Sequence, residues 1–376
     1  MRVLVVSAWE PWRRGDGACL VLHAHLRELA GRHDIEVLAA GAPRPRAAAP
    51  PNLPAPVRWY GRSLPAPIDA LQRRLRRGDE PAHVGYVGRA ALLADLRSAV
   101  KERRPDLVHL FGWGTAGLWP HLDGVPAVHD CVDPWAANWG NRTTGPGKRL
   151  LDAGELGRIR RHEQRHYPQL TAVVVRTEQD AALLREQVPG AQLSVVPNGV
   201  DPGPEPSAPP TEPVLAFLGS YDVEANVDAA ERLVREVLPL LPGARVLLIG
   251  RDPSARVLRL RGPHVEVTGF VPDVAIALSR AAVLIAPITR GVGVRNKVLE
   301  AMAAGLPVAA TSLALHGIGA SKGVLQADTP VELAHAAQAL MADPGAGPAN
   351  RERVVREFSW ARSAAALEEV WCASRS

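Results

Sequence analysis

The amino-acid sequence predicts an α/β protein with two consecutive domains, each a parallel β-sheet covered by helices. Three observations predict this fold class. Short apolar runs recur along the chain, amphipathic segments separate them, and a Pro- and Gly-rich stretch divides the runs into two series. Strands that alternate with helices are typical of parallel sheets. We therefore expect two Rossmann-like domains that face each other across a cleft, with ligands beyond the carboxyl ends of the strands.

The first series defines an expected N-terminal domain over residues 1–196. Its apolar runs predict buried strands at residues 3–6, 35–39, 107–110, 127–131 and 172–175. Amphipathic stretches at residues 20–30 and 91–103 predict two of the covering helices. Within this domain, the proline-rich residues 42–56 predict a loop, and an arginine cluster follows at residues 73–77. That cluster indicates either a solvated helix face or a membrane-surface contact.

The second series defines an expected C-terminal domain over residues 197–358. Its runs predict strands at residues 214–218, 245–249, 265–268, 283–286 and 307–310. The boundary is "PNGVDPGPEPSAPPTEP" at residues 197–213, whose proline content indicates a linker. Residues 359–376 form a separate expected helix. Phe358, Ala361, Ala365 and Leu367 are the residues expected to pack inward at its start and along it.

Composition excludes several classes of protein. The chain has 376 residues, 47% hydrophobic content and a formal net charge of +5. This charge suits an anionic small molecule and does not require nucleic acid. No apolar run reaches the roughly 18 residues of a membrane span, so no membrane association is expected. The three cysteines lie far apart, which predicts a reduced, cytoplasmic protein. No clustered set of histidine, cysteine or carboxylate residues indicates a metal site, and no cofactor other than a nucleotide-sugar co-substrate is expected.

The richest segment for chemistry is "RGVGVRNKVLEAMAAGLPVAAT" at residues 290–311. Gly291 and Gly293 mark a loop, Arg295 and Lys297 follow at the start of a helix, and Glu300 lies one turn further on. A helix N-terminus already attracts anions through its free N–H groups and its dipole. Two cations in the same turn therefore predict a phosphate or diphosphate site, with a solvated basic helix start as the alternative.

This segment, together with "PNGVD" and "TGFVPD", resembles retaining glycosyltransferases of the family 4 type, which have the two-domain GT-B fold. The resemblance implies that Arg295 and Lys297 hold a nucleotide-sugar diphosphate, with a catalytic role, and that Glu300 binds the ribose. It also implies donor contacts from Gly293, Val294 and Asn296. Many members carry a second glutamate at the position of Val292, where this chain departs from the pattern. In the resembling family, a C-terminal helix crosses back onto the first domain, and residues 359–376 are expected to do so.

Further donor contacts are expected at the ends of other strands. The resemblance implies that Gly17 faces the diphosphate and that Phe270 and Val271 hold the nucleobase. Gly219 lies in the turn after the first strand of the second domain, and Asn226 is expected to cap the following helix. His129 ends a strand of the first domain. The resemblance gives it a catalytic contact with the donor sugar, and a buried structural histidine is the alternative.

Acceptor contacts are expected in the first domain. Asp130 and Asp133 follow the same strand as His129. Trp135 and Trp139 come next and suit a stacking wall for a sugar or cyclitol ring, or ordinary packing of an irregular loop.

The expected function is transfer of a hexose-type sugar from a nucleoside diphosphate sugar, with UDP favoured, to a hydroxyl of a small soluble acceptor. The family branch implies retention of configuration. An Ala-, Arg- and Pro-rich composition favours a natural-product acceptor such as an aminoglycoside. Three alternatives remain: a cell-surface polysaccharide glycosyltransferase, a GT-B nucleotide-sugar epimerase and a non-catalytic GT-B binding subunit.

Overall fold

The structure is a computed structural model that divides into two compact units. Unit 1 comprises Met1–Pro197 and Ser363–Ser376, and unit 2 comprises Asn198–Arg362. The boundaries expected from the sequence lay at 196/197 and 358/359. The structure describes residues 1–12, 17–40, 53–60, 80–81, 84, 90–140, 146–203, 210, 212–291 and 296–375. The arginine cluster at residues 73–77 and most of the Pro-rich loop lie outside these ranges.

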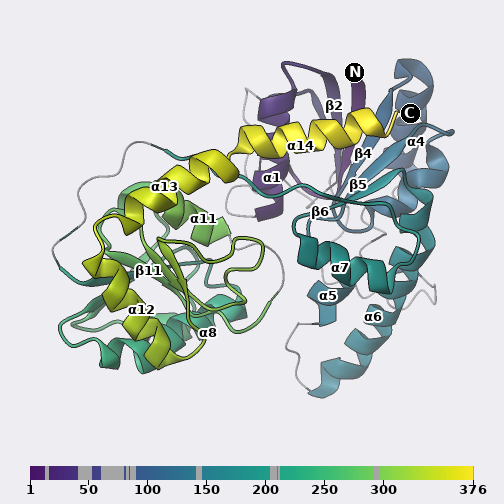
Figure 1. Ribbon diagram of the computed structural model, residues 1–376. Coiled ribbons are helices and arrows are strands. Elements are labelled where there is room, and N and C mark those ends of the chain that lie inside the picture. The colour runs from purple at the N-terminus through teal and green to yellow at the C-terminus, as the bar shows by residue number, and fades with distance from the viewer. Residues whose placement is uncertain are drawn as a thin grey trace. The chain divides into compact units, whose positions relative to one another are not determined.

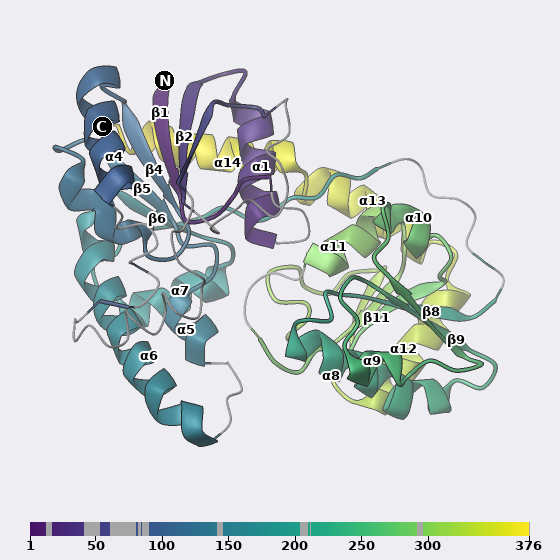
Figure 2. The same ribbon diagram turned by 180° about the vertical axis from the view of Figure 1, so that it is seen from behind.

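Unit 1 is built on a parallel sheet of seven strands in the described part of the chain, in the order β3-β2-β1-β4-β5-β6-β7. The strands are β1 (Arg2–Ser7), β2 (Asp34–Ala40), β3 (Val57–Tyr60), β4 (Leu107–Phe111), β5 (Ala127–Asp130), β6 (Ala172–Val175) and β7 (Leu193–Val195). Helices cover the sheet, and Figures 1 and 2 show α1 and α4 beside it. The helices and turns of this unit are α1 (Gly17–Leu29), α4 (Ala90–Arg103), η1 (Thr115–His121), α5 (Trp135–Gly140), α6 (Pro146–His166), η2 (Tyr167–Gln169) and α7 (Glu178–Gln187).

Unit 2 contains a parallel sheet of six described strands in the order β10-β9-β8-β11-β12-β13. The strands are β8 (Val214–Leu218), β9 (Arg245–Ile249), β10 (Val265–Gly269), β11 (Val283–Ala286), β12 (Val308–Ala310) and β13 (Val324–Gln326). The helices around this sheet are α8 (Glu224–Arg232), η3 (Leu233–Val237), η4 (Leu238–Leu240), α9 (Ala255–Leu258), α10 (Val274–Leu278), α11 (Asn296–Ala303), α12 (Pro330–Ala342) and α13 (Ala346–Glu357).

The predicted α/β architecture is confirmed, and each strand predicted from an apolar run is present with ends within one residue. The inner strands of both sheets are largely buried, as strands of a parallel sheet with helices on both faces have to be. Strands β3, β7 and β13 were missed. Each is only three or four residues long and pairs with a single neighbour at a sheet edge. Such edge strands need no continuous apolar run, so the sequence pattern did not reveal them.

The topology gives each sheet a point at which the strand order reverses. In unit 1 this point lies between β1 and β4, and in unit 2 it lies between β8 and β11. Crossover helices leave toward opposite faces at such a point, which opens a crevice at the carboxyl ends of the two strands. Polar and aromatic residues that follow these four strands are therefore the first candidates for ligand contacts.

The C-terminal helix α14 (Trp360–Ala373) packs on unit 1, where it lies beside α1 (Figures 1 and 2). The indole Nε1 of Trp371 donates to Nδ1 of His109 at 3.1 Å. Ser363 Oγ lies 2.9 Å from Nε2 of His25 and donates to the carbonyl of Pro197. These contacts tie the end of the chain to α1, to β4 and to the last residue before unit 2.

The expected buried face of α14 was partly wrong. Leu367 is buried, but Ala361 is exposed, and the other large buried side chains are Trp360 and Trp371. The helix phase therefore places residues 360, 363, 367 and 371 inward, a spacing of three to four residues. Short alanines obscured this phase in the sequence, because alanine fits either face.

No helix in the described part of the chain is long and apolar enough to cross a membrane.

Candidate functional site

The switch point of the second sheet brings together three segments of unit 2. Lys297 lies in the first turn of α11, and its Nζ donates to Oδ1 of Asn226 at 2.5 Å. The same Nζ lies 4.8 Å from the ring centroid of Phe217 in β8. Nδ2 of Asn226 in turn donates to the carbonyl of Ser220 at 2.7 Å. The side chains of Lys297 and Asn226 thus lie together beside the turn after β8, at the carboxyl end of the sheet.

Asn226 does not cap α8, contrary to the expectation. The helix begins at Glu224 with Val223 at the N-cap position, so Asn226 lies inside the first turn. Its side chain instead fills the space over the β8 turn. A Cβ atom at Gly219 would lie 3.0 Å from Cγ of Asn226, so a glycine is needed for this close approach. Asn226 therefore connects Lys297 to the turn instead of ending the helix.

Glu300 lies one helical turn after Lys297 on α11. Desolvation raises the pKa of its carboxyl group, and the positive charge of Lys297 opposes that rise. The side chain is partly exposed. A desolvated carboxylate gains from hydrogen-bond donors such as the hydroxyls of a ligand. The ribose contact that the resemblance implied for Glu300 stays a prediction.

The β10 end offers an exposed aromatic side chain. Phe270 is 69% exposed, whereas Val271 is partly buried and packs against the core. Gly269 before them has φ of +74°, a conformation that glycine adopts without strain. A large aromatic side chain left in solvent at a strand end is available for stacking against a flat ligand.

Several predicted donor residues lie at or beyond the limits of the described chain. Gly293, Val294 and Arg295, with the divergent Val292, lie outside the described residues. Asn296 is the first residue of α11, and its Oδ1 accepts from Nδ2 of Asn198 at 2.9 Å. Gly17 is the exposed first residue of α1.

Arg290 was missed by the sequence analysis. Its guanidinium contacts Asp228 of α8 and lies 3.8 Å from Glu224. These pairs bind Arg290 to the helix that also carries Asn226. No local pattern indicated this role, because the partners lie more than 60 residues earlier in the chain.

His129 does not reach a ligand site in this structure. The side chain is fully buried, with Nδ1 3.0 Å from the carbonyl of Leu110 and 3.3 Å from Oγ1 of Thr115. Its ring packs against Tyr167 at a centroid distance of 5.1 Å. Desolvation lowers the pKa of His129 to about 3, so the ring is neutral. The structure therefore favours the alternative, a buried structural histidine, because Thr115 and Tyr167 cover it.

Asp130 is likewise structural. It is fully buried and accepts two hydrogen bonds from Nη2 of Arg176, at 2.5 and 2.6 Å. Its Oδ1 also accepts the backbone N–H of Val132, a residue held at φ of +65°. An acceptor cannot reach a carboxylate that is enclosed in this way. Asp133, in contrast, is partly exposed and keeps its predicted role.

Trp135 and Trp139 are buried and do not form the exposed stacking surface that was one of the two expectations. Trp135 is fully buried and Trp139 is 6% exposed, and both belong to a small core cluster with Ile159. Among the partly exposed tryptophans, Trp9 and Trp113 follow β1 and β4 at the switch point of the first sheet. Their rings meet edge to face at 5.7 Å. Trp9 and Trp113 therefore offer aromatic surface at this switch point, and the sequence analysis did not select them.

The structure also assembles a group of potential metal ligands that the sequence analysis did not expect. Glu80, His162 and His166 each offer a ligand atom, and these atoms lie within 4.8 Å of one another. Glu80 is 82 residues from His162, so no ligand spacing could reveal the carboxylate. The signal that was present is the spacing His162-x₃-His166 in "HEQRH".

Comparison with known families identifies the class of this protein. The model "Glycosyltransferase Family 4" matches residues 15–203, and "Glycosyl transferases group 1" matches residues 212–343. The chain belongs to Glycosyltransferase Family 4, a family of transferase enzymes. Two parallel sheets with this topology and the solved relatives below establish a two-domain GT-B fold, as the resemblance predicted.

Solved structures share the fold at low sequence identity. Sucrose-phosphate synthase from Thermosynechococcus elongatus has a TM-score of 0.74 at 17% identity, covering 99% of this chain and 98% of that one. Anabaena HepE in complex with UDP and glucose has a TM-score of 0.66 at 13% identity, with 98% of each chain covered. The catalytic domain of Arabidopsis thaliana starch synthase IV, bound to ADP and acarbose, has a TM-score of 0.66 at 14% identity, covering 100% and 99%.

One curated relative matches by sequence. An exopolysaccharide phosphotransferase of Streptomyces coelicolor is 29% identical over 192 residues, which is 47% of this chain. The match spans only 20% of that protein.

Proposed function

We propose that this chain transfers a hexose from a nucleoside diphosphate sugar to a hydroxyl group of a small acceptor, with retention of configuration. The observation that carries the proposal is the meeting of Lys297, Asn226 and the Gly219–Ser220 turn at the switch point of the second sheet. A cation at a helix N-terminus beside a glycine turn provides the charge and the close backbone approach that a diphosphate needs.

The chemistry follows from that charge. The bond between the anomeric carbon and the diphosphate oxygen breaks as the bond to the acceptor oxygen forms. The acceptor proton passes to the departing phosphate, so no protein base is required. Lys297, with Arg295 from the adjoining segment, neutralises the negative charge that grows on the leaving group. Electrostatic stabilisation of this kind is commonly the largest catalytic contribution.

The proposed donor is a sugar ester of UDP, in which the base is uracil. One solved protein of the same fold was captured with UDP and another with ADP. Exposed Phe270 at the end of β10 supplies an aromatic face for the base, and Glu300 supplies a carboxylate for the ribose. Neither contact distinguishes uracil from adenine, so both nucleotides enter the test.

A small acceptor with a ring, such as an aminoglycoside or another natural product, fits unit 1. Trp9 and Trp113 present partly exposed aromatic surface after β1 and β4, beside partly exposed Asp133. Aromatic faces bind the apolar face of a sugar or cyclitol ring, while a carboxylate accepts hydrogen bonds from its hydroxyl or ammonium groups.

A cell-surface polysaccharide acceptor is the second candidate. It is favoured by one observation, the 29% identity to a segment of an exopolysaccharide phosphotransferase. The acceptor panel below therefore includes oligosaccharide fragments as well as aminoglycosides.

The first experiment is a thermal-shift panel of UDP, ADP and their sugar derivatives against wild type, Lys297→Ala and Lys322→Ala. Lys322 is exposed and distant in sequence from the proposed site, so its variant is the matched control. A ligand at 100 times its Kd stabilises a fold by about 2.7 kcal/mol. We expect one nucleotide class to shift wild type and the control, and to shift Lys297→Ala much less. Equal shifts in all three proteins would refute the site.

Turnover is tested next with the donor that binds. Release of nucleoside diphosphate that depends on one acceptor class supports the proposal, and NMR of the new anomeric proton reports retention or inversion. Consumption of donor with no acceptor would indicate an epimerase. Binding without turnover across both acceptor classes would indicate a binding subunit and overturn the transferase proposal.

A further inference from the structure

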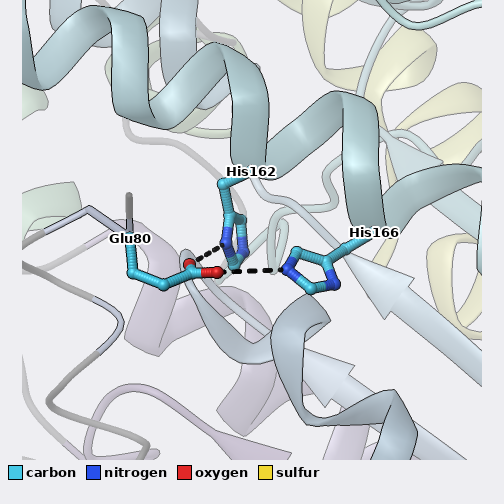
Figure 3. Close-up of side chains that lie close together, drawn as sticks. All are labelled: Glu80, His162 and His166. Carbon is cyan, nitrogen blue, oxygen red and sulfur yellow. Dashed lines mark hydrogen bonds and ion pairs between the residues drawn. The ribbon is translucent and has the colours of Figure 1, made fainter. Parts of the chain in front are cut away.

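A second cluster of chemically active side chains lies in unit 1, on the last turns of α6. His162 and His166 project from one face of this helix, four residues apart, and the carboxylate of Glu80 lies between them (Figure 3). Oε2 of Glu80 is 2.8 Å from Nδ1 of His162, and Oε1 is 3.6 Å from Nε2 of His166. The second distance is too long for a hydrogen bond.

Two buried nitrogen atoms at this cluster have no hydrogen-bond partner among the residues that the structure describes. They are Nε2 of His162 and Nε2 of His166. The His162 side chain is 1% exposed and the His166 side chain is 10% exposed. Buried polar atoms are almost always satisfied, yet Nε2 of His166 faces Oε1 of Glu80 across 3.6 Å, a gap that a hydrogen bond does not span.

The two histidine rings pack on Gly117 of η1. A Cβ atom at Gly117 would lie 3.7 Å from Nε2 of His166 and 3.8 Å from Nε2 of His162. It would also lie 3.0 Å from Cε1 of His162, so the imidazole already occupies the position that a side chain would need. The ring centroids of the two histidines are 4.4 Å apart. Both imidazoles are thus held close together against the glycine.

We infer that Glu80, His162 and His166 form a binding site for a transition-metal ion of the zinc type. Two imidazole nitrogens and one carboxylate oxygen are a ligand set that Zn²⁺ accepts, with a fourth position left for water. One ligand atom from each residue already lies within 4.8 Å of the other two, so small rotations complete the coordination. Glu80 offsets part of the charge of the ion, and exposed Arg165, whose Nη1 lies 3.6 Å from Oε1 of Glu80, has to turn toward solvent when the ion binds.

The proton positions show what metal binding changes. Trp119 donates its indole N–H to Nδ1 of His166 at 3.1 Å, so the neutral ring carries its proton on Nε2. When the ion takes Nε2, that proton moves to Nδ1, where it confronts the Trp119 donor. The indole then has to turn away. His162 donates its Nδ1 proton to Glu80. An ion that Glu80 also holds takes Nδ1 of His162 in place of that proton, because Nε2 points away from Glu80, and the neutral ring then carries its proton on Nε2.

The site is structural and not hydrolytic. Its sequence "HEQRH" has the H-E-x-x-H spacing of zinc peptidases, in which the glutamate acts as general base. Here, however, Oε1 of Glu163 accepts the backbone N–H groups of Trp135 and Ala136, at 3.0 and 3.2 Å. Glu163 therefore binds the N-terminus of α5. The ion would instead fasten the segment of Glu80 and Val84 to α6, where Val84 packs against the Trp135 cluster.

The test measures metal binding directly and does not depend on glycosyl transfer. Full-length protein without a histidine tag is stripped with a chelator and dialysed against Co²⁺, whose visible absorption reports tetrahedral nitrogen and oxygen ligands. Zn²⁺ is then added as a competitor. We expect one Co²⁺ per chain, displaced by Zn²⁺. Glu80→Gln and His162→Gln should each weaken binding by at least about 100-fold, because even second-shell changes cost 10- to 100-fold.

Two further variants make the result specific. His335→Gln removes an exposed helix histidine in unit 2 and should bind the ion as wild type does. Trp119→Phe removes the competing donor and should bind at least as tightly as wild type. Glu80 is 44% exposed, so Glu80→Gln tests the site without disturbing the core. Absence of a bound ion in wild type, or unchanged affinity in folded Glu80→Gln and His162→Gln, would overturn the inference.

Discussion

The ion pair between Asp130 and Arg176 gives the sharpest test of how unit 1 is held together. The perturbation is Arg176→Met, which keeps much of the side-chain volume and removes the charge. Both side chains are at most 1% exposed, and Arg176 Nη2 donates to both oxygens of Asp130. Nη1 of Arg176 also donates to the carbonyl of Val196 at 3.1 Å. The substitution therefore removes the Arg176 donors from a buried carboxylate and from a buried carbonyl.

The expected loss in the free energy of unfolding follows from the burial of the ion pair and not from the attraction between its charges. Removing one partner of a buried pair costs about 3–5 kcal/mol, since the remaining charge stays desolvated and uncompensated. Asp130 would keep one donor, the backbone N–H of Val132, which places the expected cost in the lower half of that range. The double variant Asp130→Asn with Arg176→Met should lose less than the sum of the single changes, with a coupling of about 1–3 kcal/mol.

Urea unfolding followed by tryptophan fluorescence provides the assay. Eight of the nine tryptophans belong to unit 1, all except Trp360, so the signal reports mainly on the unit that contains the ion pair. Arg185→Met on α7 is the control, because Arg185 is exposed and lies 3.7 Å from exposed Glu178. Such surface pairs contribute at most about 1 kcal/mol. If Arg176→Met lost no more stability than Arg185→Met, the argument from burial would be refuted.

Three other predictions concern the proposed site and the packing of unit 1. Lys297→Ala should lower kcat by about 100-fold while Lys322→Ala leaves it unchanged; a normal kcat in Lys297→Ala would remove its catalytic role. Desolvation holds the pKa of buried His109 and His129 at about 3, below the ordinary 6.5, so the unfolded chain takes up protons first. Unit 1 should therefore lose stability as pH falls from 6.5 toward 3, and urea midpoints that stay constant from neutral pH down to about 5 would contradict this. Trp371→Ala should cost about 3–5 kcal/mol in fluorescence-monitored unfolding, and a loss below about 1 kcal/mol would show that α14 does not anchor unit 1.

Local periodicity determined the fold class of this protein. The central strands were predictable because a strand buried on both faces requires a continuous apolar run, and the same rule located all the inner strands of both sheets. The start of α11 was predictable for a similar reason. Lysine and glutamate three residues apart on one helix lie on the same face whatever the rest of the chain does, and the structure places Lys297 and Glu300 one turn apart.

Only the tertiary structure decided which polar residues are exposed. His129, Asp130 and Trp135 follow one strand and were all expected in a ligand site, yet Tyr167, Arg176 and α6 enclose them. Burial depends on partners that lie 28 to 46 residues away, and strand position alone does not specify them.

The same reason explains the residues that the sequence did not reveal. Trp9 and Trp113 become neighbours because β1 and β4 are adjacent, although about 100 residues separate them in the chain. Glu80 meets His162 and His166 across 82 residues. Short-range patterns in the sequence therefore determined the two sheets and the basic helix start. Long-range packing determined the aromatic surface, the buried ion pair and the cluster of metal ligands, because those contacts exist only after the strands have been placed side by side.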